Sequence, residues 1–111
     1  MWLLDVNLPN GLRTLLKKFG HEAETTVFRG WRDMGNGILA EASYRAGFRV
    51  ILTRDRLFGE SAGKALKNFP ELAVVILKIS QAREQSYLQE FEKQWSIQPI
   101  NPVAGKVTQW P

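Results

Sequence analysis

The chain has 111 residues, no cysteine and a formal net charge of +4. This length suits one domain, and the lack of cysteine excludes disulfides, thiolate metal sites and a cysteine nucleophile. Residues 1–67 hold the whole positive excess, with 11 Lys or Arg against 7 Asp or Glu, which is compatible either with a polyanionic partner such as a nucleic acid or with an ordinary basic surface.

The start of the chain, MWLLDVNLP, lacks the basic region, the apolar core and the cleavage site of a signal peptide. No apolar run approaches the ~18 residues of a membrane span. We therefore expect a cytoplasmic protein with no membrane partner.

Strand and helix patterns alternate along the first half of the chain. An apolar strand is predicted over residues 2–6, and leucines at helical spacing predict a helix over 8–19. A weaker strand is predicted over 21–27, a glycine-rich loop over 28–37 and a second helix over 38–46. These two predicted helices stop at Gly20 and Gly47, and glycine is the residue that most easily takes the left-handed conformation of a helix end.

The alternation continues in the second half. A continuous apolar strand is predicted over residues 48–52, a short helix over 61–69 and another strand over 72–79. The segment LAVVILKI at 72–79 has β-branched residues on both faces, as in a parallel sheet that is covered on both sides. A last helix is predicted over 81–95.

The order of these elements predicts an α/β fold in which a mostly parallel sheet of four or five strands is flanked by helices. Residues 1–95 are expected to form this domain. The tail, residues 96–111, has three prolines but too many apolar residues for a disordered end. We expect it to pack on the domain as an edge strand or hairpin, and a partner-binding arm is the alternative.

Two of the three aspartates of the chain follow predicted strands. Asp5 follows the first strand and Asp55 the third, and ligands of open α/β sheets bind outside the carboxyl ends of the strands. If these two strands are neighbours, the carboxylates converge, and a cation such as Mg²⁺ would neutralise their repulsion. Each aspartate is also explained as a turn former.

Three motifs occur in order: LLDVNLP at residues 3–9, GWRDMGNGIL at 30–39 and LTRDRLFG at 52–59. Together they resemble a small PIN-like family whose members typically read LLDENLP, then a GW or GL loop leading to NGEL, then TxDxDF. The resemblance implies a compact single α/β domain with a parallel sheet. The best-known PIN-like proteins are Mg²⁺- or Mn²⁺-dependent ribonucleases, and many of them are toxins of toxin–antitoxin pairs.

The resemblance assigns the catalytic and metal-binding roles to Asp5 and Asp55. The polar residues expected to support them are Asn7, Asn36, Thr53, Asp33 and Glu60. Each of these five also has a structural explanation, as a helix cap, a strand end or a solvated loop residue.

Three positions depart from the pattern of the family. Val6, Ile38 and Leu57 stand where the relatives have acidic residues. A hard divalent cation needs oxygen ligands, and two carboxylates hold one hydrated Mg²⁺ only weakly. The departures therefore favour a catalytically degenerate domain as the alternative to a nuclease.

Four arginines flank the motifs, namely Arg29, Arg32, Arg54 and Arg56. Guanidinium groups in these positions would contact the phosphates of a nucleic acid, and Trp31 beside them could stack on an unpaired base. A solvated rim, with Trp31 packed against the core, explains the same residues.

The leading hypothesis from the sequence is a metal-dependent ribonuclease or nuclease of the PIN-like toxin type, which hydrolyses a phosphodiester of RNA, or of DNA, with a metal-activated water. The alternative is a degenerate PIN-like module that binds RNA or an antitoxin-like protein. A homodimer is compatible with both. Three carboxylates that meet at the strand ends would favour the nuclease, and two would favour the binding module.

Overall fold

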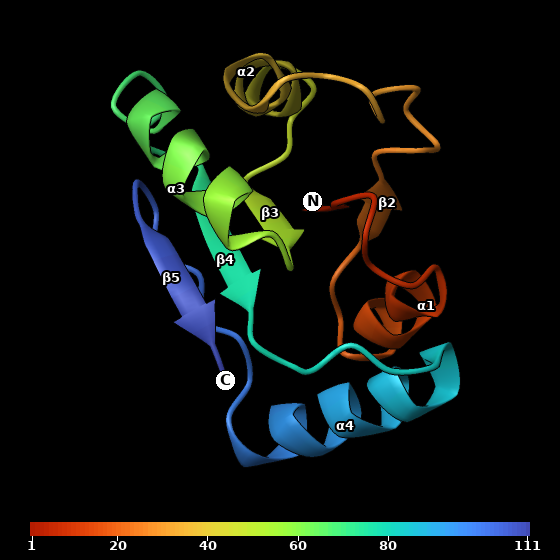
Figure 1. The fold of residues 1–111 in the computed structure, drawn as a ribbon. Coiled ribbons are helices and arrows are strands. Elements are labelled where there is room, and N and C mark those ends of the chain that lie inside the picture. Colours follow the sequence, from red (N-terminus) through yellow and green to blue (C-terminus); the bar gives the residue numbers. More distant parts are fainter.

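The computed structural model describes residues 1–35, 37–58 and 60–111, and Asn36 and Gly59 lie outside the described residues. Strands and helices alternate along the chain (Figure 1). The elements are, in order, β1 (Trp2–Leu4), α1 (Gly11–Lys18), β2 (Ala23–Thr25), α2 (Asn36–Arg45), β3 (Val50–Thr53), α3 (Arg56–Ala65), β4 (Ala73–Leu77), α4 (Glu84–Ile97) and β5 (Val107–Trp110).

These strands form one sheet in the order β2-β1-β3-β4-β5, and each neighbouring pair is parallel. The predicted α/β fold with a mostly parallel sheet is therefore confirmed. β1 and β3 are neighbours, with Leu4 paired to Leu52, so the segments that follow them leave the sheet side by side. We call this end of the sheet the carboxyl edge and the opposite end the amino edge.

Helices cover both faces of the sheet, with α1 and α4 on one face and α2 and α3 on the other (Figure 1). Successive side chains of a strand point to opposite faces. In β3, Leu52 therefore packs in the core beneath α1 and α4, and Ile51 packs in the core beneath α2 and α3. Both side chains are fully buried, which explains why this strand is apolar without alternation.

Aromatic side chains fill much of the core beneath α1 and α4. The Phe91 and Trp110 ring centroids lie 4.8 Å apart, and the Trp95 and Trp110 centroids 6.2 Å apart. His21, the one histidine of the sequence, is half-buried and stacks on Trp2 with 4.4 Å between the ring centroids. The histidine is thus used in packing, at the amino edge.

The third helix begins earlier than the sequence pattern predicts. The expected helix covers residues 61–69, whereas α3 runs over Arg56–Ala65. The cause is Asp55, whose side chain accepts hydrogen bonds from two backbone N–H groups of the first turn and so caps the helix. Phe58 and Ala62, one turn apart, are then both buried in the core.

Two other boundaries differ from the prediction because tight turns follow the strands. The first helix begins at Gly11 rather than at residue 8, since the backbone N–H of Leu8 turns back to the carbonyl oxygen of Asp5 at 3.1 Å. β2 ends at Thr25, since the backbone N–H of Arg29 turns back to the carbonyl oxygen of Thr25 at 3.2 Å.

Part of the tail, Val107–Trp110, forms β5, which pairs with β4 and lies at the end of the sheet order. Trp110 is buried, and its indole N–H donates to the carbonyl oxygen of Gln98 at 2.9 Å. Among the helices of the described residues, none is long and apolar enough to span a membrane.

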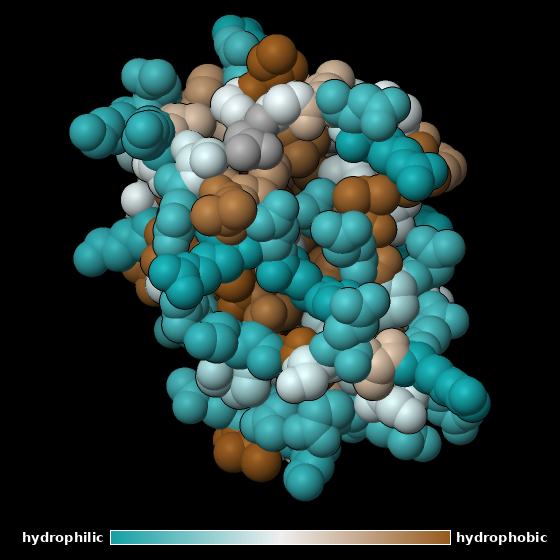
Figure 2. Space-filling model, viewed as in Figure 1, coloured by the Kyte–Doolittle hydropathy of each residue, from teal (hydrophilic) through white to brown (hydrophobic). Residues whose placement is uncertain are grey.

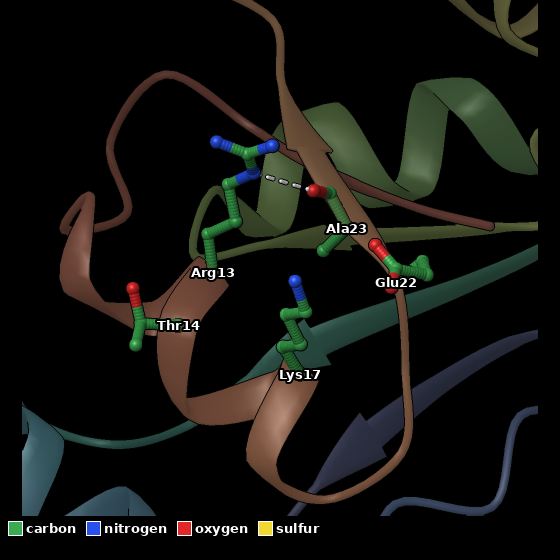
Figure 3. Close-up of a pocket in the computed structure, with 5 residues that line it drawn as sticks. All are labelled: Arg13, Thr14, Lys17, Glu22 and Ala23. Atoms are coloured by element: carbon green, nitrogen blue, oxygen red, sulfur yellow. Dashed lines mark hydrogen bonds between the residues drawn. The ribbon is translucent and has the colours of Figure 1, made fainter.

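The other edge strand, β2, is covered by a side chain of α1. The carbonyl oxygen of Glu22 accepts from the backbone N–H of Trp2 in β1, so the next carbonyl, that of Ala23, points away from β1. Arg13 Nε donates to this Ala23 oxygen at 2.8 Å (Figure 3). A cavity of about 290 Å³ lies here between α1 and β2, away from the carboxyl edge.

Candidate functional site

Asp5 and Thr53 meet at the carboxyl edge because β1 and β3 are adjacent. The Thr53 hydroxyl, which is fully buried, donates to Asp5 Oδ2 at 2.8 Å. The same hydroxyl oxygen accepts from the backbone N–H of Asp55 at 3.0 Å. One buried hydroxyl therefore connects the Asp5 carboxylate to the backbone of the second aspartate.

The Asp5 carboxylate also organises the turn after β1. Its Oδ1 accepts from the backbone N–H of Val6 at 2.8 Å, so both carboxylate oxygens have protein donors. Its backbone N–H donates to the carbonyl oxygen of Leu52 at 3.0 Å. Asp5 is half-buried, and its hydrogen bonds to Leu52 and Thr53 hold it against β3.

Asp55 is exposed and caps α3. Its Oδ1 accepts from the backbone N–H groups of Leu57 at 2.9 Å and Phe58 at 3.2 Å. This is the position at which a carboxylate satisfies the unpaired donors of a helix start. Asp5 therefore stabilises a turn and Asp55 caps a helix. Each carboxylate accepts hydrogen bonds from the protein.

An open cavity of about 360 Å³ lies at the carboxyl edge, lined by Asn7, Arg54, Asp55 and Gln81. These residues follow three neighbouring strands, namely β1, β3 and β4. The lining is polar throughout, with two amides, one guanidinium and one carboxylate. We call this space the edge cavity.

Arg54 is the cation of the edge cavity. One of its terminal nitrogens donates to the carbonyl oxygen of Asn7 at 3.2 Å, which is its single hydrogen bond to the described residues. A guanidinium has five N–H donors, so most of them remain for a ligand. The guanidinium carbon lies 5.7 Å from the ring centroid of Tyr87, and this contact holds the side chain over α4.

The other three predicted arginines have different surroundings. Arg29 pairs with Glu24, and its guanidinium lies 5.4 Å from the ring centroid of Trp31 and 5.0 Å from that of Phe48, so it is used in packing. Arg56 pairs with Glu60 one turn later on the exposed face of α3, at 3.0 Å. Arg32 is exposed in the loop between β2 and α2.

The supporting residues expected from the sequence separate into two groups. Asn7 lines the edge cavity, and Thr53 lies behind it as the link between the aspartates. Asp33 and Glu60 are exposed and are not among the lining residues. Asn36 lies outside the described residues.

The carboxylates at this edge do not fit a centre with several acidic ligands. Within residues 1–35, 37–58 and 60–111, no group of three or more His, Asp or Glu residues is arranged so that it could hold a metal ion. Ile38 and Leu57, which stand where the PIN-like motifs have acids, are exposed apolar side chains.

Apolar side chains are exposed around the same edge. Phe28 follows β2, and Leu57 lies in the first turn of α3, with 74% and 73% of their surfaces exposed. Ile38 is exposed in the first turn of α2. Figure 2 shows hydrophobic side chains as separate patches among hydrophilic ones, including patches over α2 and α3. The surroundings of the edge cavity thus mix polar, cationic and apolar groups.

The sequence did not indicate two residues of this region, Gln81 and Tyr87. Gln81 lines the edge cavity, and its signal was its place after β4. The sequence pattern predicted it as the first residue of the last helix, whereas α4 begins only at Glu84. Tyr87 is a buried core residue of α4. Its hydroxyl is buried with no hydrogen-bond partner among the described residues. Burial raises the pKa of Tyr87 to about 12, and the charge of Arg54 acts in the opposite direction.

No protein family, curated protein sequence or solved structure matches the chain significantly. The resemblance to PIN-like proteins therefore rests on the three motifs of the sequence and stays a prediction.

Proposed function

We propose that this chain is a PIN-like domain that binds single-stranded RNA at the carboxyl edge. The observation that carries the proposal is Arg54, which lines an open polar cavity and has one hydrogen bond to the described residues. Guanidinium groups bind phosphate through several N–H donors at once. A phosphate of the RNA backbone is the group that this arginine suits best.

The other groups around Arg54 suit an unpaired strand rather than a duplex. The amides of Asn7 and Gln81 can both donate to and accept from base edges and ribose hydroxyls. Phe28 is exposed in the segment that follows the edge strand β2, at the same edge of the sheet. Its ring offers a face on which an unpaired base can stack. The basic excess of residues 1–67 would raise the rate of association with a polyanion.

A second candidate is a PIN-like toxin ribonuclease that needs Mg²⁺ or Mn²⁺, with Asp5 and Asp55 as its acidic residues. The observation that favours it is the placement of both aspartates at one edge, connected through the Thr53 hydroxyl. Its weakness is the donor set, which lacks a third carboxylate among the described residues. RNA binding is common to both candidates, and cleavage separates them.

The test compares two arginine variants that remove the same charge. Arg54→Ala removes the cation of the edge cavity, and Arg45→Ala removes an exposed arginine of α2 that pairs with Glu41 in its own helix. We expect Arg54→Ala to weaken binding of a labelled single-stranded RNA by about tenfold or more, and Arg45→Ala by about twofold or less. Fluorescence anisotropy at several salt concentrations measures this, and equal losses in the two variants would contradict the proposal.

The same RNA, incubated with Mn²⁺ or Mg²⁺ and with EDTA, tests the second candidate. Cutting that needs the metal and disappears in Asp5→Asn and Asp55→Asn would establish a ribonuclease. Binding without cutting would leave the binding module as the function.

A further inference from the structure

The outer surface of α1 lies between two cavities. The cavity of about 290 Å³ between α1 and β2 is lined by Arg13, Thr14, Lys17, Glu22 and Ala23 (Figure 3). A groove of about 330 Å³ lies between α1 and α4, and Thr14 lines both spaces. The cavity and the groove therefore form one continuous surface across α1, which we call the α1 surface.

The groove between α1 and α4 has an apolar base. Leu15 of α1 and Leu88 of α4 line it and are half-buried. The two helices approach closely there, since a Cβ added at Gly11 would lie 2.7 Å from Leu88 Cδ1. Lys18 of α1 pairs with Glu92 of α4 at 2.9 Å, so the rim carries one neutralised ion pair. The other lining residues are exposed, polar and uncharged: Thr14, Gln85 and Gln89.

The cavity on the β2 side carries the unpaired positive charge of the α1 surface. Figure 3 shows the Arg13 and Lys17 side chains extending from the side of α1 that faces β2. Neither forms an ion pair with a described residue. Arg13 donates from Nε to the Ala23 carbonyl oxygen, which leaves its terminal nitrogens for a ligand. Because the two residues are one helical turn apart, both charges lie on one flank of α1.

The carboxylates of the α1 surface favour a protein partner over a polyanion. Glu22 lines the β2-side cavity and Glu92 lines the groove, so each space also contains a negative charge. The closely spaced phosphates of RNA or of an anionic membrane would lie against these carboxylates, and like charges repel. A protein helix can instead place single carboxylates opposite Arg13 and Lys17. The apolar stripe of such a helix packs into a groove between two other helices.

We propose that the α1 surface binds an amphipathic helix of a partner protein. The apolar side chains of this helix enter the groove at Leu15 and Leu88, and its carboxylates pair with Arg13 and Lys17. The lining residues of the α1 surface and of the edge cavity do not overlap. This inference is therefore independent of the RNA binding proposed above.

The probe is a displayed library of random helical peptides, from which the parent protein selects its ligands. The selected peptides are labelled, and fluorescence anisotropy measures their affinity for three variants. Lys17→Glu reverses a charge of the α1 surface, Gln89→Trp fills the groove, and Lys64→Glu is the matched control. Lys64 is an exposed lysine in the last turn of α3, as Lys17 is in the last turn of α1. Thermal unfolding establishes that each variant is folded.

We expect the selected peptides to combine Leu, Ile or Phe at helical spacing with Asp or Glu. Lys17→Glu and Gln89→Trp should each weaken their binding by about tenfold, and Lys64→Glu by about twofold or less. Arg54→Ala should bind these peptides as the parent does, which separates the result from RNA binding.

Three outcomes would overturn the inference. The first is that no peptide is selected. The second is that Lys17→Glu and Gln89→Trp lose no more affinity for the selected peptides than the control Lys64→Glu. The third is that phosphatidylglycerol vesicles or a single-stranded RNA, and no peptide, bind the parent and are lost in both surface variants.

Discussion

The two ends of β3 each carry an arginine, and the two arginines have opposite surroundings. Arg49, at the amino edge, donates from one nitrogen to the carbonyl oxygens of Tyr44 at 3.1 Å and Phe48 at 2.8 Å. Its Nε lies 3.6 Å from a Glu71 oxygen, and its guanidinium carbon lies 4.2 Å from the Tyr44 ring centroid. Arg54, at the carboxyl edge, makes one hydrogen bond of 3.2 Å to the described residues and a looser ring contact.

The difference between the two arginines separates a structural role from a binding role. The donors of Arg49 are used to hold the end of α2 against the start of β3, so a ligand would have to displace protein contacts. Most donors of Arg54 are left over, and they face a polar cavity at the edge where parallel sheets bind ligands. The number of guanidinium N–H donors without a protein partner, and not the exposed fraction of the side chain, therefore indicates which arginine binds a ligand.

The substitution that we expect to destabilise the carboxyl edge most is Thr53→Val, which removes the hydroxyl and keeps the shape of the side chain. The change leaves an Asp5 oxygen and the Asp55 backbone N–H without their partner, so we expect a loss of about 2 kcal/mol in the free energy of unfolding. Urea denaturation measures it. Thr53→Ser keeps the hydroxyl and should lose clearly less, and equal losses in both would mean that the methyl group, not the hydroxyl, stabilises this edge.

Truncating the two arginines tests the comparison directly. Arg49→Ala should lower the free energy of unfolding by about 1–2 kcal/mol, because two carbonyl oxygens lose a charged donor. Arg54→Ala should change it by less than about 0.5 kcal/mol. Urea denaturation gives both values, and a larger loss in Arg54→Ala would reverse the assignment of the two residues.

Asp55 combines capping with a charge, and two variants separate them. Asp55→Ala removes the cap of α3 and should cost about 1 kcal/mol of stability, whereas Asp55→Asn caps nearly as well and should cost less than half of that. Thermal unfolding followed by circular dichroism compares them. A stable Asp55→Asn that has changed RNA affinity would show that the charge acts on the ligand, and equal destabilisation by both variants would contradict the capping role.

The smallest expected effect at neutral pH concerns Tyr87, whose burial acts on stability only at high pH. Burial raises its pKa from the ordinary 10.0 of a tyrosine to about 12, so the unfolded chain ionises this phenol first as the pH rises. The stabilisation is complete below pH 10 and is lost between about pH 10 and 12. The parent should therefore lose more stability than Tyr87→Phe across this window, and parallel pH profiles would contradict it. Near pH 7 we expect the variant to be as stable as the parent or slightly more stable, because an unpaired hydroxyl is removed.

The sequence was sufficient for the parallel α/β arrangement, because β1, β3 and β4 are buried on both faces and read as apolar runs. It also placed Asp5 and Asp55 after strands, but it left open whether these strands are neighbours, which the structure shows. The start of α3 was wrong because the pattern gave more weight to the apolar spacing around Leu66 than to the cap at Asp55.

The use of each arginine could not be read from the sequence. Arg29 and Arg54 look alike in their motifs, and only the folded chain brings Glu24 to one and the edge cavity to the other. The sequence also could not show that the Tyr87 hydroxyl is buried without a partner among the described residues. Burial and hydrogen-bond partners depend on segments that are far apart in the chain.

The position of β5 has a consequence for synthesis on the ribosome. β4 is the most apolar strand, AVVIL, and it acquires its second neighbour only when residues 107–110 have been made. Until then one side of this strand has open backbone donors and acceptors, which other chains can pair with. The nascent chain therefore passes through an interval in which it is prone to aggregate, and the interval ends when Trp110 packs against α4.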